Sequence, residues 1–175
     1  MTLSNSHPII KTYNIYTDGS CLKNPGNGGW SFVVYDDHHK HLFEDSGHEL
    51  NTTNNRMELQ GAIHALEYAS LMSTYSPLIK TSVKKVINIF TDSRYVQRGL
   101  NEWLPNWILN NWKGTSGKPV KNKDLWLIIK DLNVSEDVIW HWVKAHNGNV
   151  GNEAADILAS GAARKSKYFF YRFVS

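Results

Sequence analysis

Two short apolar segments of this chain end in the same way. Residues 15–18 read Ile-Tyr-Thr-Asp and residues 89–92 read Ile-Phe-Thr-Asp, so each places residues typical of a buried strand before an aspartate. A carboxylate left unpaired at the edge of a core costs more free energy than its neighbours gain by packing. The chain must therefore fold so that both strand ends meet water or a partner, and the repeated pattern favours a cation between them.

The segments around these two runs indicate how they are arranged. The expected elements of the first half are four strands and one helix, with strands over residues 12–18, 30–36, 40–48 and 84–91 and the helix over 54–72. A connection that contains a helix joins parallel strands. We therefore expect the first and fourth strands to lie side by side, with Asp18 and Asp92 at adjacent carboxyl ends, where open α/β sheets bind ligands.

The second half alternates helices with one more strand. We expect helices over residues 93–103, 122–132 and 152–165 and a strand over 138–143. The segment 107–119 is expected to be irregular, because glycines and a proline interrupt it. Three successive strands followed by strands alternating with helices predict an α/β fold with one mixed sheet.

Length and composition fit a single globular domain. The chain has 175 residues, of which 41% are hydrophobic and 20% charged. We expect one domain over residues 1–175, with a core of about 10–165 and a tail over 166–175. Its apolar runs are far shorter than the ~20 residues of a membrane span. The single cysteine, Cys21, excludes an internal disulfide and fits a reducing compartment, so we expect a cytoplasmic protein with no membrane association. Nothing in the sequence requires more than a monomer, which is the state we expect.

Neighbouring aspartates repel one another unless one is protonated or a cation intervenes. Oxygen ligands favour hard cations such as Mg²⁺ or Mn²⁺. Glu58 and Asp156 could complete such a site, although Glu58 also has capping-box spacing from Asn55, and Asp156 would be a favourable charge near a helix start. The strand-end aspartates have their own alternative, since Asp-Gly and Asp-Ser commonly form turns.

One histidine and one basic stretch also attract attention. His146 lies in a glycine-bearing loop ten residues before Asp156. Histidines near metal sites can move protons because the ordinary imidazole pKa is close to neutrality. Four lysines without an acid among them fall within eleven residues, at positions 113, 118, 121 and 123, with tryptophans at 103, 107, 112 and 126 around them. This stretch is either a solvated face or a nucleic-acid groove, in which aromatic rings lie beside lysines.

Four motifs together resemble the ribonuclease H type 1 family. They are Asp-Gly-Ser at 18–20, Thr-Thr-Asn-Asn-Arg-Met-Glu-Leu at 52–59, Thr-Asp-Ser-Arg-Tyr-Val at 91–96, and Lys-Ala-His at 144–146 with Asn-Glu-Ala-Ala-Asp at 152–156. They occur in the family's order and spacing. The resemblance implies a ribonuclease H-like fold, with a five-stranded mixed sheet and helices on both faces, and an endonuclease that cuts the RNA strand of RNA–DNA hybrids.

The resemblance also implies roles for the acids and the histidine. Asp18, Glu58, Asp92 and Asp156 would hold two Mg²⁺ ions, with Mn²⁺ as a substitute, and His146 would assist proton transfer or product release. Two metals can activate the attacking water and stabilise the leaving 3′ oxygen. The expected products carry 5′-phosphate and 3′-hydroxyl ends, without strong sequence specificity.

The same resemblance implies three groups of substrate-binding residues. Those near sugar 2′-hydroxyls, which distinguish RNA from DNA, are Gly19, Ser20, Cys21, Asn24 and Asn54. Those around a DNA-strand phosphate are Thr53, Arg56 and Asn122. Those along the DNA channel are Trp103 and Trp107, which could instead form a core edge, and the lysines Lys113, Lys118 and Lys121.

The chain departs from the family's pattern at three places. The basic stretch begins only at Lys113, Arg94 adds a cation close to Asp92, and the aromatic tail over 168–173 has no recognised counterpart. Two rival functions are another enzyme on this fold, such as an integrase, a resolvase or a retroelement nuclease, and a catalytically dead hybrid-binding module. The complete acid set and the histidine loop favour the hybrid-cleaving nuclease.

Overall fold

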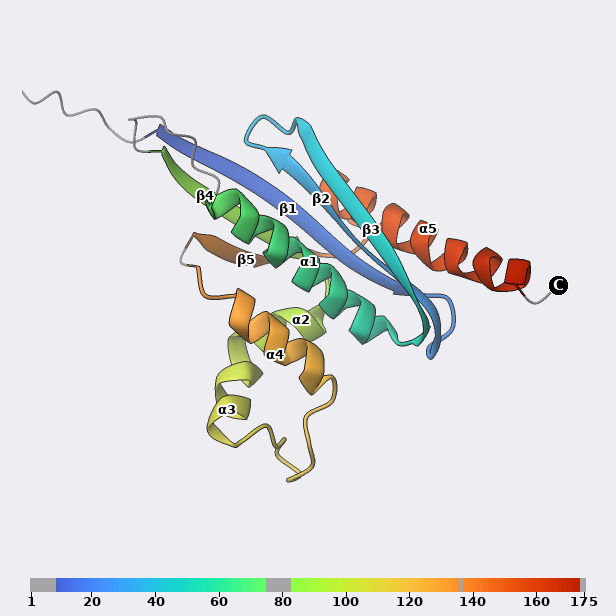
Figure 1. Ribbon diagram of the computed structural model, residues 1–175. Helices are drawn as coiled ribbons and strands as arrows, with labels where there is room; N and C mark the ends of the chain where they lie inside the picture. The colour runs from blue at the N-terminus through green and yellow to red at the C-terminus, as the bar shows by residue number, and fades with distance from the viewer. Residues whose placement is uncertain (1–8, 75–82, 136, 174–175) are drawn as a thin grey trace, which may run out of the picture.

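The strands form one mixed sheet, as the sequence predicts. The computed structural model describes residues 9–74, 83–135 and 137–173. The five strands are β1 (Ile9–Cys21), β2 (Gly26–Asp36), β3 (His41–Thr52), β4 (Val83–Thr91) and β5 (Val138–Trp142). Their order in the sheet is β3-β2-β1-β4-β5. The β1–β2 and β2–β3 pairs are antiparallel, whereas β4 is parallel to both β1 and β5 (Figure 1).

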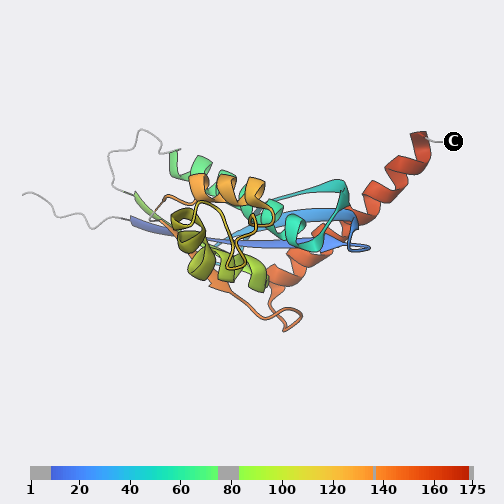
Figure 2. The ribbon, with the colours of Figure 1, turned by 90° about the horizontal axis from the view of Figure 1, so that it is seen from below.

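Helices cover both faces of this sheet. They are α1 (Asn54–Thr74), α2 (Arg94–Arg98), the π-helical η1 (Gly99–Trp103), α3 (Leu104–Leu109), α4 (Lys123–Leu132) and α5 (Val150–Phe173). Helix α1 lies on one face with α4 beside it, and α5 crosses β1 and β2 on the other face (Figure 2). Over the described ranges, no helix has both the length and the apolar character that a membrane crossing requires.

Several elements are longer than the sequence predicts. Strand β1 continues to Cys21 because its pairing with β2 extends to the Cys21–Gly28 pair, and β3 reaches Thr52 opposite Gly26. The helix expected to end at residue 103 continues through η1 into α3, so residues 107–109 are helical rather than irregular. Helix α5 continues to Phe173, where a tail was expected. The side chains of that aromatic segment lie outside the described part of the structure.

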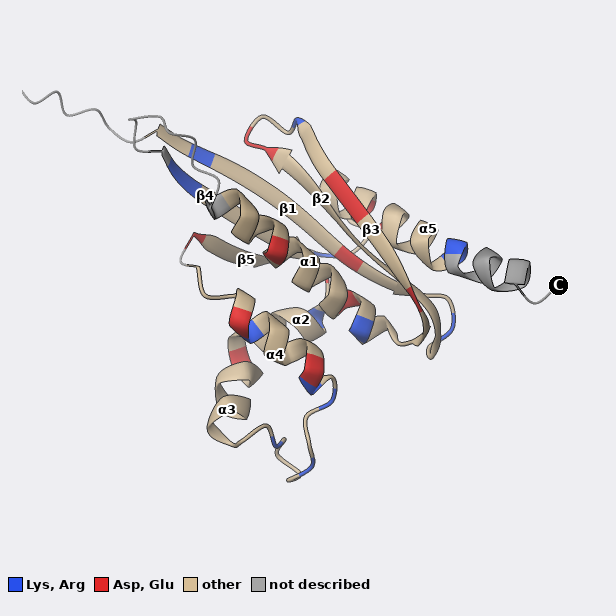
Figure 3. Cartoon of the chain, in the orientation of Figure 1, with Lys and Arg blue, Asp and Glu red and all other residues tan. Residues whose placement is uncertain are grey.

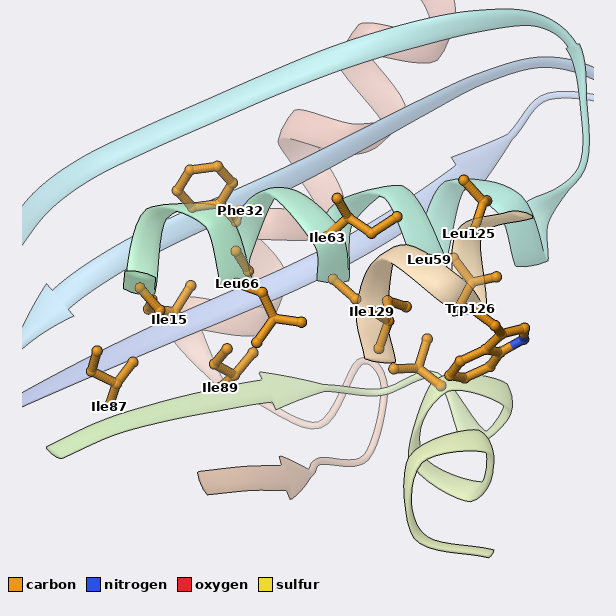
Figure 4. Close-up of a cluster of buried hydrophobic side chains, with 14 of the residues drawn as sticks. Ile15, Phe32, Leu59, Ile63, Leu66, Ile87, Ile89, Leu125, Trp126 and Ile129 are labelled. Carbon is orange, nitrogen blue, oxygen red and sulfur yellow. The ribbon is translucent and has the colours of Figure 1, made fainter. Parts of the chain in front are cut away.

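The main core lies between the sheet and the α1–α4 layer. Ile15 of β1 and two isoleucines of β4 meet a buried stripe of α1, and Trp126 of α4 closes one end (Figure 4). Each such side chain contributes roughly 1.5–3 kcal/mol by leaving water. Strand side chains alternate between faces, so Tyr16 points the other way and packs with Val33 and Ala155 under α5. The two cores hold α1 and α5 at the same end of the central strands.

Candidate active site

The sheet register places the two aspartates at neighbouring strand ends. The parallel pairing of β1 and β4 ends with Thr17 opposite Thr91. Asp18 and Asp92 are the next residues of their chains, so they lie side by side as the repeated sequence pattern predicts.

Asp18 is the most confined of the four acids. Only 9% of the surface of Asp18 is exposed to solvent. Burial raises the pKa of its carboxyl to about 8, and the nearby charges of Asp92, Asp156 and Glu58 also raise it, while a hydrogen bond from the Gly19 amide acts in the opposite direction. Four carboxylates from four different elements are therefore close enough to repel one another.

Glu58 reaches this cluster because β1 and α1 approach closely. A Cβ atom at Gly19 would lie 2.1 Å from the backbone nitrogen of Glu58, so only glycine permits the contact. The Glu58 carboxylate accepts a hydrogen bond from the Asn54 amide at 2.9 Å and another from the Ser93 hydroxyl. Burial raises the pKa of Glu58 to about 7, and the charge of Asp92 adds to this, although both hydrogen bonds lower it.

The start of α1 decides between the two readings of Glu58. The helix begins at Asn54, and the Thr53 hydroxyl accepts the Arg56 amide at 3.4 Å, which makes Thr53 the capping residue. Glu58 instead turns toward Ser93, which is itself the N-cap of α2. The capping-box alternative is wrong because the helix starts two residues earlier than an Asn55 cap requires.

Helix α5 brings the fourth acid and an amide to the cluster. The Asn152 side-chain amide donates to Asp92 at 2.8 Å, and Asp156 lies one turn further along the same helix face. The Ser160 hydroxyl is 3.3 Å from a carboxylate oxygen of Asp156 and 3.2 Å from the hydroxyl of Ser20. The first turns of α5 are thus tied to the ends of both β4 and β1.

His146 lies at the outer side of the cluster. Its backbone has a φ of 48°, in the left-handed region, and its side chain is largely exposed. Its Nδ1 atom is 3.8 Å from a carboxylate oxygen of Asp156. The structure therefore brings the loop histidine beside one of the four acids.

The donor atoms of this cluster fit a hard divalent cation. Four carboxylates supply only oxygen, and the buried Oδ1 atom of Asn152 has no hydrogen-bond partner among the described residues. Among the described residues, no three His, Cys, Asp or Glu side chains lie close enough together to coordinate one metal ion. Instead, Glu58 and Asp92 direct carboxylate oxygens to neighbouring hydroxyl and amide donors. The chemistry of the set suits Mg²⁺ or Mn²⁺, whose charge would relieve the repulsion.

The residues predicted to contact RNA lie around the turn after β1 and the start of α1. The backbone nitrogen of Asn54 donates to the side-chain oxygen of Asn24 at 3.3 Å, which ties the two segments together. Gly19 and Ser20 belong to the same strand end, next to Asp18. The Cys21 thiol donates to the carbonyl of Lys23 at 2.8 Å. These residues are contiguous with the acidic cluster.

The residues predicted to bind a DNA phosphate gather where α1 and α4 begin. The Arg56 guanidinium forms two hydrogen bonds to the carboxylate of Asp124, at 3.2 and 2.9 Å. Asn122 is the N-cap residue of α4, two positions before Asp124, and Thr53 caps α1. Arg56 is therefore already paired with an acid within the predicted pocket.

The aromatic channel residues extend outward from the core. Ring centroids are 5.7 Å apart for Trp103 and Trp107 and 5.4 Å apart for Trp107 and the buried Trp126. Trp107 therefore packs at the edge of the core, which was the alternative to a channel role. It also remains part of the predicted channel. The predicted lysines, Lys113, Lys118 and Lys121, lie on the loop between α3 and α4, where basic residues are spaced along the chain (Figure 3).

Three polar residues of this region have contacts to the site that their sequence motifs did not indicate. They are Asn152, Ser160 and Tyr95. Asn152 and Ser160 stand four residues to either side of Asp156, so helical spacing alone could have placed them on its face. The Tyr95 hydroxyl, by contrast, contacts residues about thirty positions away, and no local pattern indicates this.

The chain is similar to known proteins over most of its length. The RNase H family model matches residues 10–164. The chain is 44% identical to a ribonuclease H of Hahella chejuensis over 152 residues, covering 86% of this chain and 93% of the relative. It is 46% identical to a ribonuclease HI of Xylella fastidiosa strain 9a5c over 155 residues, covering 88% and 93%.

Two solved structures share the fold and some sequence. The crystal structure of LC9-RNase H1, a type 1 RNase H with the type 2 active-site motif, superposes with a TM-score of 0.74 at 28% identity, covering 92% of this chain and 76% of the other. A foamy viral protease-reverse transcriptase in complex with dsDNA gives a TM-score of 0.72 at 26% identity, covering 87% and 94%.

Proposed function

The chain belongs to the ribonuclease H family and hydrolyses the RNA strand of RNA–DNA hybrids, and from this premise we propose that its four clustered carboxylates carry out the reaction. The observation that carries the proposal is the burial of Asp18 within reach of three other acids. A fold keeps such a repulsive group only at the expense of stability, and perturbed carboxylates of this kind gather at functional sites.

Asp18, Glu58, Asp92 and Asp156 are the residues that would hold the divalent ions, two Mg²⁺ with Mn²⁺ as a substitute. When bound, these ions supply an activated water and stabilise the leaving oxygen of the phosphodiester. The protein's own contribution is to fix the ligands: Asn54 and Ser93 hold Glu58, and Asn152 holds Asp92.

The raised pKa values of Asp18 and Glu58 add a consequence for ion binding. A cation is bound by ionised carboxylates, so its binding displaces protons that these two groups retain near neutral pH. We expect magnesium affinity to rise with pH between about pH 6 and 8 for this reason.

His146 acts beside Asp156 as a group that moves a proton or helps product leave. Its exposure gives it access to bulk water, and its Nδ1 atom lies 3.8 Å from a carboxylate oxygen of Asp156. The products carry 5′-phosphate and 3′-hydroxyl ends. A histidine that exchanges protons with water serves this chemistry without being indispensable, because water can partly replace it.

The substrate surface divides between the two strands of the hybrid. Residues 19–21 with Asn24 and Asn54 recognise RNA 2′-hydroxyls, and Thr53, Arg56 and Asn122 bind a DNA phosphate. The channel tryptophans and the loop lysines, Trp103, Trp107, Lys113, Lys118 and Lys121, extend the contact. Contacts to phosphate and sugar carry no base information, so cleavage lacks strong sequence preference. The chain acts as one catalytic domain, a monomer in the cytoplasm.

A nuclease assay with four labelled substrates tests the proposal. RNA–DNA hybrid, double-stranded RNA, single-stranded RNA and double-stranded DNA are incubated with Mg²⁺, Mn²⁺ or EDTA. We expect cleavage of the hybrid alone, in its RNA strand, and only with a divalent ion. The fragment ends are read by labelling with and without phosphatase. Hybrid cleavage that persists in EDTA would overturn the metal assignment.

A further inference from the structure

The hydroxyl of Tyr95 joins three segments beside the predicted DNA-phosphate pocket. Tyr95 is the second residue of α2, three positions after Asp92. Its hydroxyl accepts hydrogen bonds from the Asn122 amide at 3.2 Å and from the Trp126 indole at 3.1 Å, and donates to the Lys121 carbonyl at 3.5 Å. A phenolic hydroxyl has one hydrogen and two acceptor positions, so this group is fully used.

Asn122 has an unusual arrangement for its position. It is the N-cap residue of α4, where an asparagine ordinarily accepts a hydrogen bond from the first helical amides. Here its backbone is left-handed, with a φ of 55°, and its side chain makes no capping hydrogen bond. One amide hydrogen is directed to Tyr95 instead, which leaves the other for an outside acceptor.

The surrounding contacts bring this amide to the region of Arg56, which belongs to the predicted phosphate pocket. The Arg56–Asp124 ion pair ties the first turn of α1 to the first turn of α4, two residues after Asn122. Tyr95 ties the same position to α2. The predicted pocket therefore lies where α1 and α4 begin, and the positive ends of these two helix dipoles favour an anion there.

We propose that Tyr95 is a positioning residue for hybrid binding, which fixes the Asn122 amide so that its second N–H meets a phosphate of the DNA strand. This inference rests on the proposed function of the pocket and deepens it. Without the hydroxyl, the Asn122 side chain can rotate or turn back to cap α4, and the phosphate loses a donor of fixed direction. Trp126, on which the channel residue Trp107 packs, loses its hydrogen bond in the same step.

The first test removes only the hydroxyl. Tyr95→Phe should raise KM for hybrid about fivefold and leave kcat within about twofold of the parent, because one hydrogen-bonded contact to substrate is weakened while the carboxylates are untouched. Tyr68→Phe is the matched control, since Tyr68 stacks on Phe43 at the sheet's far edge. An unchanged KM for Tyr95→Phe, or the same KM rise in Tyr68→Phe, overturns the inference.

A second test locates the phosphate. Hybrids with a single neutral methylphosphonate, moved stepwise along the DNA strand, should raise KM of the parent at one linkage, where the pocket binds its anion. Tyr95→Phe should show less than half of that rise. An equal rise in both proteins overturns the role of Tyr95 alone. No sensitive linkage in the parent overturns the DNA-phosphate pocket itself, so the two failures are distinct.

A double-mutant cycle separates positioning from general destabilisation. Asn122→Ala should raise KM as Tyr95→Phe does, and combining the two should add little, because both remove the same contact. Additive KM effects overturn the inference. Circular dichroism melts fix an assay temperature at which all variants are folded, since Tyr95→Phe leaves the buried indole N–H of Trp126 without its acceptor.

Discussion

The inner and outer halves of the acidic cluster are built differently. The inner half, Asp18 and Glu58, is enclosed between β1 and α1 and held by short contacts to neighbouring residues. The outer half, Asp156 and His146, sits on α5 and a loop, and its histidine makes one contact of 3.8 Å. The inner half is therefore held by more contacts than the outer half, whose histidine is largely exposed.

The difference has an energetic counterpart. Confining like charges in the inner half destabilises the folded chain, and a bound cation would reverse that effect. The outer half carries little such strain, since water reaches it. Substitutions in the two halves should consequently differ in their effects. Changes to the inner acids should alter both stability and turnover, whereas a change to the outer histidine should alter turnover alone.

The largest effect is expected from the acid between the two halves. Asp92→Asn should lower kcat on hybrid by at least about 1,000-fold, because an amide is a poor ligand for a divalent ion. Fold and hybrid binding should be retained, as measured by circular dichroism and by fluorescence anisotropy with labelled hybrid. A kcat within tenfold of the parent would show that Asp92 is not a metal ligand.

Asp18→Asn should reveal the instability of the inner half. The pKa of Asp18 is raised from an ordinary 3.8 to about 8, so between these values the folded chain keeps a proton that the unfolded chain has lost. Stability attributable to this carboxyl is thus complete below pH 4 and is lost as pH rises toward 8. Asparagine does not titrate, so in EDTA the free energy of unfolding of the variant should exceed that of the parent by up to about 5 kcal/mol at pH 8.

Urea unfolding at a series of pH values measures this difference. It should shrink to near zero at pH 4 and should also shrink at pH 8 when Mg²⁺ is added, because the ion stabilises only the parent effectively. A variant less stable than the parent at pH 8 without metal would contradict the burial argument.

Asn152→Ala tests the link between the halves, since this amide belongs to α5 but holds Asp92. Loss of such a supporting contact typically reduces metal affinity or activity about 10-fold to 100-fold, and we expect the lower end here. Magnesium titrations of kcat provide the measurement. Asn149→Ala is the control: its side-chain oxygen accepts the Asn152 backbone amide, so its loss should reduce stability by about 1 kcal/mol and leave the magnesium dependence unchanged.

His146→Ala should have the mildest effect, a fall in kcat of about tenfold with unchanged stability, because an exposed proton carrier can be replaced in part by water. Steady-state kinetics and thermal melts supply both values. A loss of kcat as large as that of Asp92→Asn would mean that His146 is as necessary for turnover as the acids.

The sequence predicted the pairing of Asp18 with Asp92 better than the contacts that support the acidic cluster. Apolar runs ending in aspartate, separated by a helical segment, were sufficient to place Asp18 beside Asp92, because parallel pairing follows from connectivity. The role of Gly19 was not predictable in this way, since it depends on how closely β1 approaches α1. The hydroxyl of Tyr95 likewise contacts Asn122 only after α2 and α4 have packed.

Element ends show the same limit. Strand β1 extends beyond its apolar segment to Cys21, because its backbone pairing with β2 continues to Gly28 and does not depend on the side chains. The helical path beyond residue 103 continues because Gly99 lets the helix lie against Trp126, where a Cβ atom would come within 2.0 Å of the ring. Both are long-range contacts, and periodicity within one segment does not report them.

The position of α5 in the chain has a consequence for the timing of activity. This helix is synthesised after all the other described elements, and it carries both Asp156 and the amide that holds Asp92. A nascent chain that has completed its sheet through β5 still lacks Asp156, one of the four clustered carboxylates. The proposed acidic site should therefore be complete only after α5 has been synthesised and has docked across β1 and β2.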